Sequence, residues 1–363
     1  MNWLVIIIII ILLAAIFAAV TRYEYRKVFH VRGKEATPFF DHFFSVHPEL
    51  SVQPFACASG AESLYGVRLR YEESPAATPA ATPEESPAAT PAASPAESPA
   101  DPPKGLIVMM HGYGLNMEHY LPQAEFFARA GYAVVLYDGV GVGRSSGKGI
   151  RGLPQHVADA CAVLDYVESA PELSALPLML YGHSSGGYAV CALSCKKKYP
   201  VKAIVSLAGY TEALGGMKAK LRKKYGPFSF LGLLLLAVFQ IAEFGREASG
   251  YKSIRGLGLA GCPAFIVHSE NDPILPYADH FVKIQKAFSG RPGFRFWTTD
   301  ARNHNLGVPS DANERVWQLQ KQMRQDPGAA ESLRDDLRDE LWGLQMLIDE
   351  DMLTRFLEFY DSV

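Results

Sequence analysis

The most apolar stretch of the chain lies near its first residue. From Trp3 to Val20 every residue is apolar, and the run holds no charge, glycine or proline. A helix of about 20 such residues crosses the hydrocarbon layer of a membrane. The run therefore predicts a single-pass membrane anchor at 1–21, followed by a juxtamembrane segment at 22–50.

The flanks of this run bear on cleavage and orientation. Secretory signals usually start with basic residues, whereas only Met1 and Asn2 precede the run, which favours an uncleaved anchor. Ala18 and Ala19 nevertheless suit a cleavage site, so the cleaved signal stays an alternative. Basic residues follow the run at Arg22, Arg26, Lys27, Arg32 and Lys34. Their excess slightly favours the cytoplasm for the catalytic domain and leaves its side of the membrane open.

Beyond the first hundred residues, short apolar runs alternate with helical patterns. Such alternation is typical of a parallel sheet with crossover helices. The predicted strands cover 106–110, 132–137, 177–181, 201–207, 264–267 and 294–298, and the predicted helices cover 118–130, 153–168, 186–197 and 277–288. An alternating strand is also predicted at 64–71, and one long helix that packs on the sheet at 329–360.

A low-complexity tract occupies 74–103. It repeats Ser or Thr, Pro and two Ala, with scattered acidic residues. Proline at every fourth position is incompatible with helix or strand, so we expect a polyproline-like surface insertion. Its position predicts that it replaces a hairpin turn between the strands at 64–71 and 105–110. An inert spacer is favoured over a glycosylated stalk or a partner-binding tract.

The composition of the chain mainly excludes classes of partner and site. The 363 residues, 48% of them hydrophobic, suit one large domain, predicted at 51–363. A formal net charge of -3 gives no basic field, so no nucleic acid partner is expected. The five cysteines are odd in number and lack CxxC spacing, so we expect small buried side chains and neither a disulfide framework nor a zinc site.

The sharpest chemical motif is the segment 182–187, which reads Gly-His-Ser-Ser-Gly-Gly. It follows a predicted strand and opens a predicted helix, which is the context of a nucleophile elbow with Ser184 at its apex. Side chains at Gly182 or Gly186 would collide with neighbouring backbone in so tight a turn. A bare GxSxG pattern arises by chance, so the prediction depends on this context.

A serine hydroxyl needs a base within reach and a carboxylate that orients the base. Asp272 and His304 each follow a predicted strand, and the order Ser, Asp, His differs from the two common protease orders. Taken singly, an Asp before Pro is often a turn residue and a loop His is often solvated. Glu270 and Asp300 are the nearest competing carboxylates.

Attack on a carbonyl also requires donors for the oxyanion. The segment 111–114 reads His-Gly-Tyr-Gly and follows the first buried strand. We expect the amides of Tyr113 and Ser185 to be the two donors, the latter because it follows the nucleophile. His111 and His183 are interpreted as structural, since one base suffices.

Together these residues resemble the α/β-hydrolase superfamily, and within it the monoacylglycerol lipase-like and serine aminopeptidase-like branch, over roughly 52–308. The matching positions are His111, Gly112, Tyr120, Gly131, Tyr132, Asp138, Gly141, Gly143, Ser145, the elbow, Asp272, Pro273 and His304. The resemblance implies an α/β-hydrolase fold, with a mostly parallel eight-stranded sheet flanked by helices and covered by a helical cap. Val140 departs from the branch, which usually has Arg there, and puts any ion pair at that position in doubt.

The interruption at 209–257 falls where related enzymes insert the cap. Basic residues at Lys218, Lys220, Arg222, Lys223 and Lys224 precede an apolar segment at 228–244. This pattern suits a lid that lines an acyl pocket and touches anionic lipid headgroups. The alternative is a helix buried on the sheet, and the segment is too short for a confident second membrane span.

The leading hypothesis is a serine hydrolase that cleaves monoacylglycerol, lysolipid or similar acyl esters and needs no metal or organic cofactor. An aminopeptidase of the same fold is one alternative, for which Glu243 and Glu247 are the nearest anchors for a substrate amine. A membrane-tethered binding protein without activity is the other. The expected partners are a small acyl ester or lipid substrate and membrane lipid, and protein partners stay unknown.

Overall fold

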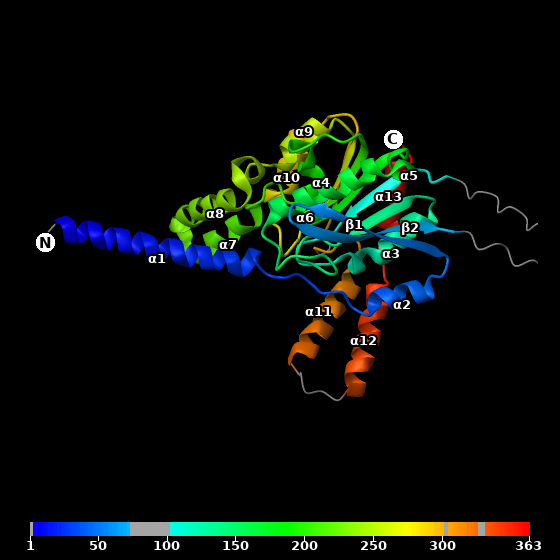
Figure 1. Ribbon diagram of the computed structural model, residues 1–363, viewed down its shortest axis with the longest axis horizontal. Helices are drawn as coiled ribbons and strands as arrows, with labels where there is room; N and C mark the ends of the chain where they lie inside the picture. The colour runs from blue at the N-terminus through cyan, green and yellow to red at the C-terminus, as the bar shows by residue number, and fades with distance from the viewer. Residues whose placement is uncertain (1–2, 73–101, 301–303, 326–330) are drawn as a thin grey trace, which may run out of the picture.

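A single sheet forms the centre of the chain, for which the computed structural model describes residues 3–72, 102–300, 304–325 and 331–363 (Figure 1). The strand order is β1-β2-β4-β3-β5-β6-β7-β8. β1 and β2 form an antiparallel hairpin, β2 is antiparallel to β4, and the other neighbours are parallel. The strands are β1 (Leu50–Ser59), β2 (Glu62–Tyr71), β3 (Leu106–Met110), β4 (Ala133–Tyr137), β5 (Leu178–His183), β6 (Val201–Leu207), β7 (Ala264–Ser269) and β8 (Phe294–Thr299). The predicted eight-stranded, mostly parallel sheet is confirmed.

Helices cover both faces of the sheet. One face packs against α4 (Leu153–Ser169), α6 (Ser185–Ala192), α9 (Ser253–Ala260) and α10 (Phe281–Phe288). The other packs against α2 (Phe39–Val46), α3 (Leu121–Arg129) and α13 (Glu350–Tyr360). Short helices η1 (Met117–Tyr120), α5 (Pro171–Ser174), η2 (Leu193–Cys195) and η4 (Tyr277–Asp279) complete these connections.

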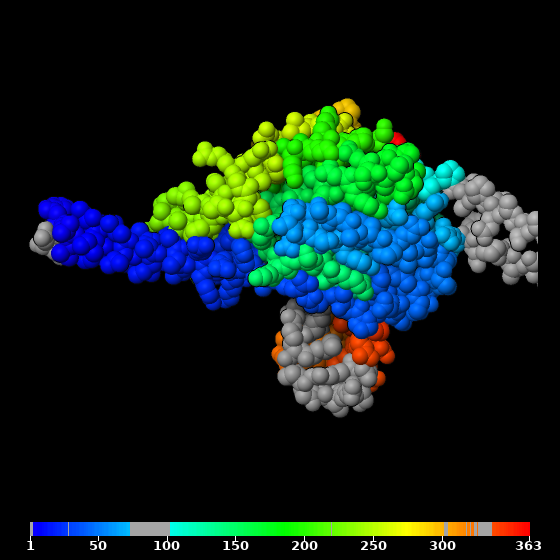
Figure 2. All heavy atoms as spheres, in the orientation of Figure 1, coloured from blue at the N-terminus to red at the C-terminus, as the bar shows by residue number. Residues whose placement is uncertain are grey.

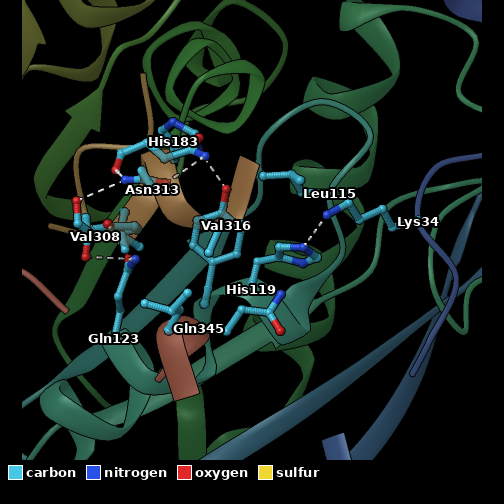
Figure 3. A pocket seen from close by; sticks show the side chains of 14 residues that line it. Lys34, Leu115, His119, Gln123, His183, Val308, Asn313, Val316 and Gln345 are labelled. Atoms are coloured by element: carbon cyan, nitrogen blue, oxygen red, sulfur yellow. Dashed lines mark hydrogen bonds between the residues drawn. The ribbon is translucent and has the colours of Figure 1, made fainter. Parts of the chain in front are cut away.

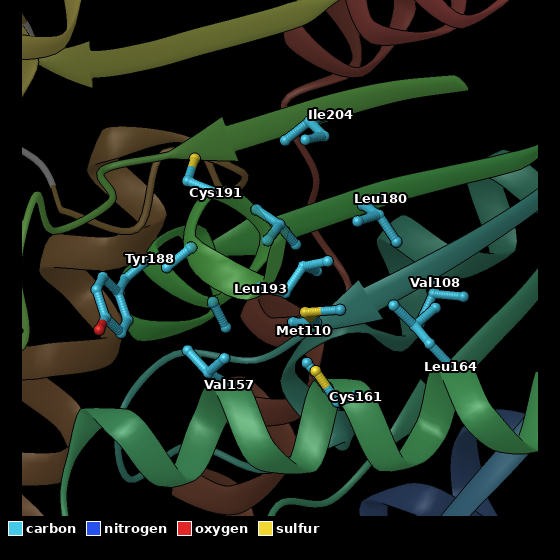
Figure 4. Close-up of a cluster of buried hydrophobic side chains, with 14 of the residues drawn as sticks. Val108, Met110, Val157, Cys161, Leu164, Leu180, Tyr188, Cys191, Leu193 and Ile204 are labelled. Atoms are coloured by element: carbon cyan, nitrogen blue, oxygen red, sulfur yellow. The ribbon is translucent and has the colours of Figure 1, made fainter. Parts of the chain in front are cut away.

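The central strands are apolar on both sides because both faces are covered. Every residue of β3, β4 and β5 is buried. Figure 4 shows one side of this core, where Val108 and Leu180 of the sheet lie opposite Val157 and Leu164 of α4, with Cys191 of α6 nearby. This packing fixes the strand ends at which the candidate catalytic residues lie.

The N-terminal helix α1 (Trp3–Phe29) projects from the body as a rod (Figure 2). Most of its side chains from Trp3 to Val20 are exposed. The stretch Trp3–Lys27 is long and apolar enough to cross a membrane. The helix continues past the predicted anchor and ends against the folded body.

The segment predicted as a cap, 209–257, contains α7 (Gly215–Tyr225), the short η3 (Gly226–Phe228) and α8 (Ser229–Ser249), followed by α9. α7 contacts α8, and α8 lies beside α1 (Figure 1). The combined stretch Gly215–Ser249 is also long and apolar enough to cross a membrane. It is not one straight rod, because Gly226 has a φ of 52° and the two helices pack on each other.

The predicted hairpin around the proline-rich tract is wrong. β2 and β3 are not neighbours, since β4 lies between them and pairs with both. Strand order is decided by long-range pairing, which adjacency in the sequence does not reveal. Residues 73–101 of the tract at 74–103 lie outside the described residues.

The C-terminal region also differs from the prediction of one helix at 329–360. The chain forms α12 (Glu331–Gln345) and α13, preceded by the unpredicted α11 (Ser310–Gln325). The Asp349 carboxylate accepts from the amide of Met352 (3.0 Å) and caps α13, so it starts a new helix where apolar periodicity alone suggests continuity. α13 packs on the sheet, whereas α11 and α12 project from the body (Figure 1). The helix predicted at 186–197 likewise ends earlier, at Ala192.

Candidate active site

Ser184 occupies the sharp turn between β5 and α6. Its φ of 57° and ψ of -114° are strained for a residue with a side chain, and its exposure is 4%. A Cβ at Gly182 would overlap the carbonyl of Gly186, and one at Gly186 would overlap the carbonyl of Met110. The close backbone approach thus requires glycine at both positions.

The structure brings Ser184, His304 and Asp272 together from three separate strand ends. The Ser184 Oγ lies 2.9 Å from His304 Nε2, and His304 Nδ1 lies 2.7 Å from Asp272 Oδ2. The carboxylate fixes the tautomer, since a proton on Nδ1 leaves Nε2 free to accept the serine proton. A hydroxyl, an imidazole and a carboxylate in this order can support nucleophilic catalysis.

Asp272 is held as an anion although its side chain is fully buried. Burial acts to raise its pKa, but the hydrogen bond from His304 and the amides of Leu275 and Ile274 outweigh burial and lower the pKa below its usual value. Those amides donate to Oδ1 at 2.9 and 2.7 Å. The competing carboxylates, Glu270 and Asp300, are exposed instead of buried. Glu270 accepts a hydrogen bond from the hydroxyl of Thr298 (3.2 Å).

His183 links the base to the glycine-containing loop. The amide of Gly112 donates to the hydroxyl of Tyr120 (2.8 Å), which donates to His183 Nδ1 (2.8 Å). The Nε2 proton of His183 is then given to the backbone carbonyl of His304 (2.9 Å). Burial lowers the pKa of His183 to about 3, so the ring stays neutral. This geometry agrees with a structural role.

His111 is also engaged in backbone contacts. The amide of Gly139 donates to its Nε2 (2.8 Å), so its Nδ1 proton is given to the carbonyl of Gly112 (2.8 Å). Burial lowers its pKa as well. The two bonds fix the loop that carries Tyr113.

The candidate oxyanion donors lie on two elements next to the serine. Ser185 is the first residue of α6, and amides at a helix N-terminus point outward without intrahelical partners. Tyr113 lies in a tight turn, in which the amide of Leu115 donates a hydrogen bond to the carbonyl of Gly112 (3.1 Å). Gly114, the residue after Tyr113, has a φ of 73°, which this turn requires. Their oxyanion role stays a prediction.

Two polar neighbours of the triad were not predicted from the sequence. The hydroxyl of Tyr210 hydrogen-bonds Ser184, and burial raises the pKa of this phenol to about 12. His268 Nε2 lies 3.4 Å from Asp272 Oδ2 and is buried. Both lie at the carboxyl ends of strands, β6 and β7, and that position was the signal available in the sequence.

A small cavity of about 110 Å³ adjoins this group. Tyr113 and Tyr210 line it, and its other walls come from α4, α7, the segment after Asp272 and the end of α1: Phe29, Leu153, Ala213, Gly216, Met217, Lys220, Ile274 and Leu275. No acidic side chain is among these described residues. The cavity is therefore suited to an apolar group next to the serine.

A larger cavity of about 290 Å³ borders the loop that follows His304 (Figure 3). His119, Gln123, Val308 and Val316 line it, and at one end Lys34 Nζ lies 2.8 Å from His119 Nε2. Ser184 lines neither cavity. We associate the reacting group with the smaller one, because Tyr210 contacts Ser184 directly and Tyr113 carries a candidate oxyanion amide.

The loop at 139–147 shows how the chain accommodates Val140. The Arg32 guanidinium, from the segment after α1, donates to the carbonyls of Gly147 (2.7 Å) and Gly143 (3.0 Å). Asp138 accepts from the amides of Met117 (2.9 Å) and Arg144 (2.8 Å), and burial raises its pKa to about 6. An arginine from another segment thus contacts this loop.

One group of described side chains has the spacing of a metal site. It consists of His47, Glu49 and Glu125. His47 already pairs with Glu49 (3.1 Å) and Glu125 with Arg129 (3.4 Å). None of the three lines the cavities beside the triad.

Known proteins resemble this chain in sequence and in fold. A family model described as serine aminopeptidase, S33, matches residues 101–227. The monoacylglycerol lipase of Mycolicibacterium smegmatis is 25% identical over 217 residues, covering 52% of this chain and 77% of the lipase. The esterase Pf2001 of Pyrococcus furiosus superposes with a TM-score of 0.50 at 15% identity, covering 75% of this chain and 90% of the esterase.

These matches agree with the strand order and with the sharp turn at Ser184. The family match contains the candidate nucleophile and oxyanion loop, and the structural likeness covers 75% of the chain. The chain has the α/β-hydrolase fold, and over residues 101–227 it resembles the S33 serine aminopeptidase family.

Proposed function

We propose that this chain is a serine hydrolase that cleaves carboxylic esters of lipid type, such as monoacylglycerol or lysolipid, through an acyl-enzyme. The observation that carries the proposal is the continuous hydrogen-bond path from Ser184 through His304 to Asp272, at 2.9 and 2.7 Å. Such a path lets the proton leave the hydroxyl as its oxygen attacks a carbonyl carbon.

In the first half of the reaction, the Ser184 Oγ bonds to the ester carbonyl carbon and its proton passes to His304 Nε2. The amides of Tyr113 and Ser185 donate hydrogen bonds to the carbonyl oxygen as it gains negative charge. Asp272 remains ionised and stabilises the imidazolium. His304 then protonates the leaving alcohol, and the acyl group stays on Ser184.

In the second half, water replaces the alcohol. His304 takes a proton from the water as it attacks the acyl carbon, and returns it to Ser184 as the acid is released. The fully buried Asp272 keeps the same orientation throughout. No step is assigned to a metal or cofactor.

The lipid-like substrate is supported by the surroundings of the serine. The adjoining cavity is lined mainly by apolar and aromatic side chains, and α8, which packs on α7 and α1, exposes Phe230, Leu234 and Val238. A distant relative is a monoacylglycerol lipase. These observations favour an acyl chain over a polar group.

The aminopeptidase alternative lacks a suitable acid beside the serine. Glu243 pairs with Arg151 (3.5 Å), and Glu247 accepts from the hydroxyl of Tyr251 (3.3 Å). Both glutamates line a different cavity from the one next to Tyr210. A substrate amine would therefore meet no carboxylate there among the described residues.

Localisation follows from α1 as a proposal. We propose that α1 anchors the chain in a membrane, because its first 18 or so side chains offer apolar surface to lipid. The basic residues at its C-terminal end favour a cytoplasmic catalytic domain.

The test uses a fluorophosphonate probe and a substrate panel. The full-length protein in detergent is expected to be labelled, and Ser184→Ala is expected to lose both labelling and hydrolysis of fatty-acyl glycerol. Preferential cleavage of aminoacyl substrates would favour the aminopeptidase. Equal labelling of the two proteins, or the absence of any hydrolysis, would contradict the proposal and favour a binding protein.

A further inference from the structure

The end of the N-terminal helix reaches the cavity beside the serine. Phe29, the last residue of α1, is 4% exposed and forms part of the cavity wall. Its ring meets that of Tyr113 edge to face, with centroids 6.0 Å apart. Tyr113 carries a candidate oxyanion amide, so the helix and the reaction site share a boundary.

This end of α1 is fixed to the catalytic body by several contacts. The Tyr25 hydroxyl donates to the carbonyl of Arg151 (3.1 Å), and its ring lies 6.4 Å from that of Phe239 in α8. After the helix, the amide of Lys34 donates to the carbonyl of Gly114 (2.9 Å), in the loop that carries Tyr113. The position of Phe29 relative to Ser184 is thus set by packing.

The outer surface next to this wall is apolar. α8 lies beside α1, and Figure 2 shows the two projecting on the same side of the body. Phe230, Leu234 and Val238 of α8 are 61%, 60% and 50% exposed. Lys224 at the end of α7 pairs with Glu24 of α1 (3.1 Å), which adds a polar contact between the cap and the helix.

Helix geometry places the cavity close to the lipid surface. Phe29 lies nine residues beyond Val20, or about 13 Å along the helix. The headgroup layer is roughly 5–8 Å thick on each side of a bilayer. A lipid ester needs to rise only a short distance to bring its carbonyl to the serine, while its tail stays against α1 and α8.

We propose that α1 is part of the substrate site as well as an anchor, with Phe29 as the side chain that limits the acyl chains accepted. The acyl tail of a membrane-resident ester lies along α1, and the Phe29 ring forms the part of the cavity wall at the end of that helix. The inference rests on the proposed ester hydrolysis and adds a specificity-determining residue to it.

The test replaces Phe29 by a smaller and by a larger side chain. Phe29→Ala and Phe29→Trp are prepared as full-length proteins, and kcat/KM is measured for a series of 4-nitrophenyl esters from acetate to palmitate. Phe29→Ala is expected to raise the ratio of long-chain to short-chain kcat/KM by roughly tenfold or more, and Phe29→Trp to lower it.

A matched control lies on the same helix. Tyr23 is 65% exposed, and Tyr23→Ala is expected to leave the chain-length profile unchanged. Fluorophosphonate labelling and a thermal unfolding scan show whether Ser184 and the fold are intact in each variant. An unchanged profile in both folded, labelled Phe29 variants overturns the inference while leaving ester hydrolysis standing. A wild-type protein that is neither labelled nor active would instead defeat the proposed function itself.

Discussion

The carboxyl edge of the sheet and the face formed by α1 and α8 differ in the burial and the bonding of their side chains. At the sheet edge, polar groups are buried and paired with one another, as in the bonds among Ser184, His304 and Asp272. On the helical face, apolar side chains such as Leu234 are exposed. The hydrogen bonds of the triad are formed within the chain, whereas an exposed apolar face of this kind is typical of a surface that binds a membrane or a partner.

Under the proposed function, this difference separates the reacting groups from the surface that selects the substrate. A buried, preorganised network orients reacting groups without rearrangement, because its hydrogen bonds already exist before substrate arrives. An exposed apolar face contributes only when a lipid covers it. Changes at the sheet edge should therefore act on all esters, and changes to the exposed side chains of the helical face only on esters held in a membrane.

The largest effect is expected at the carboxylate of the sheet edge. Asp272→Asn should lower kcat for every ester by about 10⁴-fold, because the amide stabilises the wrong imidazole tautomer and cannot balance the imidazolium. Steady-state kinetics with a dissolved short-chain ester measure this. The matched change Glu270→Gln removes an exposed carboxylate nearby and should leave kcat unchanged. Equal losses in the two variants would mean that Asp272 has no special role.

Acidification should lower the free energy of unfolding, because the buried region contains imidazoles that stay neutral in the folded chain. Burial lowers the pKa of His156 and of His183 to about 3. Because these rings bind protons near pH 6.5 only in the unfolded chain, their contribution to stability is fully present above that pH and is lost as pH falls toward about 3. Each ring should cost about 2 kcal/mol of unfolding free energy between pH 7.5 and pH 5.

Replacing one ring tests this. The Nε2 of His156 has no hydrogen-bond partner among the described residues, so His156→Gln should make the loss on acidification about 2 kcal/mol smaller. Chemical denaturation at the two pH values gives the free energies. The exposed His42 serves as the control, and His42→Gln should keep the wild-type loss. A wild-type loss that persists in His156→Gln would show that this ring is already protonated in the folded chain.

The smallest effect is expected on the helical face. Leu234→Gln should reduce hydrolysis of an ester embedded in vesicles by roughly tenfold, since about 1.5 kcal/mol or more of apolar burial in lipid is lost. Hydrolysis of a dissolved short-chain ester should stay the same. Leu259 of α9 is 45% exposed, away from α1, and Leu259→Gln should change neither rate. If Leu234→Gln lowered the rate of hydrolysis of both the embedded and the dissolved ester, the two regions would not differ in the way described.

The sheet and the candidate triad could be predicted because they depend on local signals. Buried strands appear as apolar runs, and residues after such runs gather at one sheet edge. Ser184 lies between a strand and a helix, and Asp272 and His304 follow strands, so topology brings them together. The glycines at 182 and 186 were predictable from sterics alone.

Features that depend on long-range contact were not predictable. The contact of Phe29 with Tyr113 joins residues far apart in the chain, and no periodic pattern encodes it. Nothing local indicated that β4 separates β2 from β3. The break before α13 was missed because the Asp349 cap competes with an apolar spacing that continues across it.

The position of α13 has a consequence for biosynthesis. Its residue Tyr360 donates to the carbonyl of Leu180 (2.8 Å) in β5, the strand that leads to Ser184. The amide of Asp349, just before α13, donates to the carbonyl of Gly307 (3.1 Å), close to His304. During translation α1 leaves the ribosome before α13, so the strand and the base loop gain these contacts only late in synthesis. The candidate active site is therefore not fully supported until synthesis has passed Tyr360.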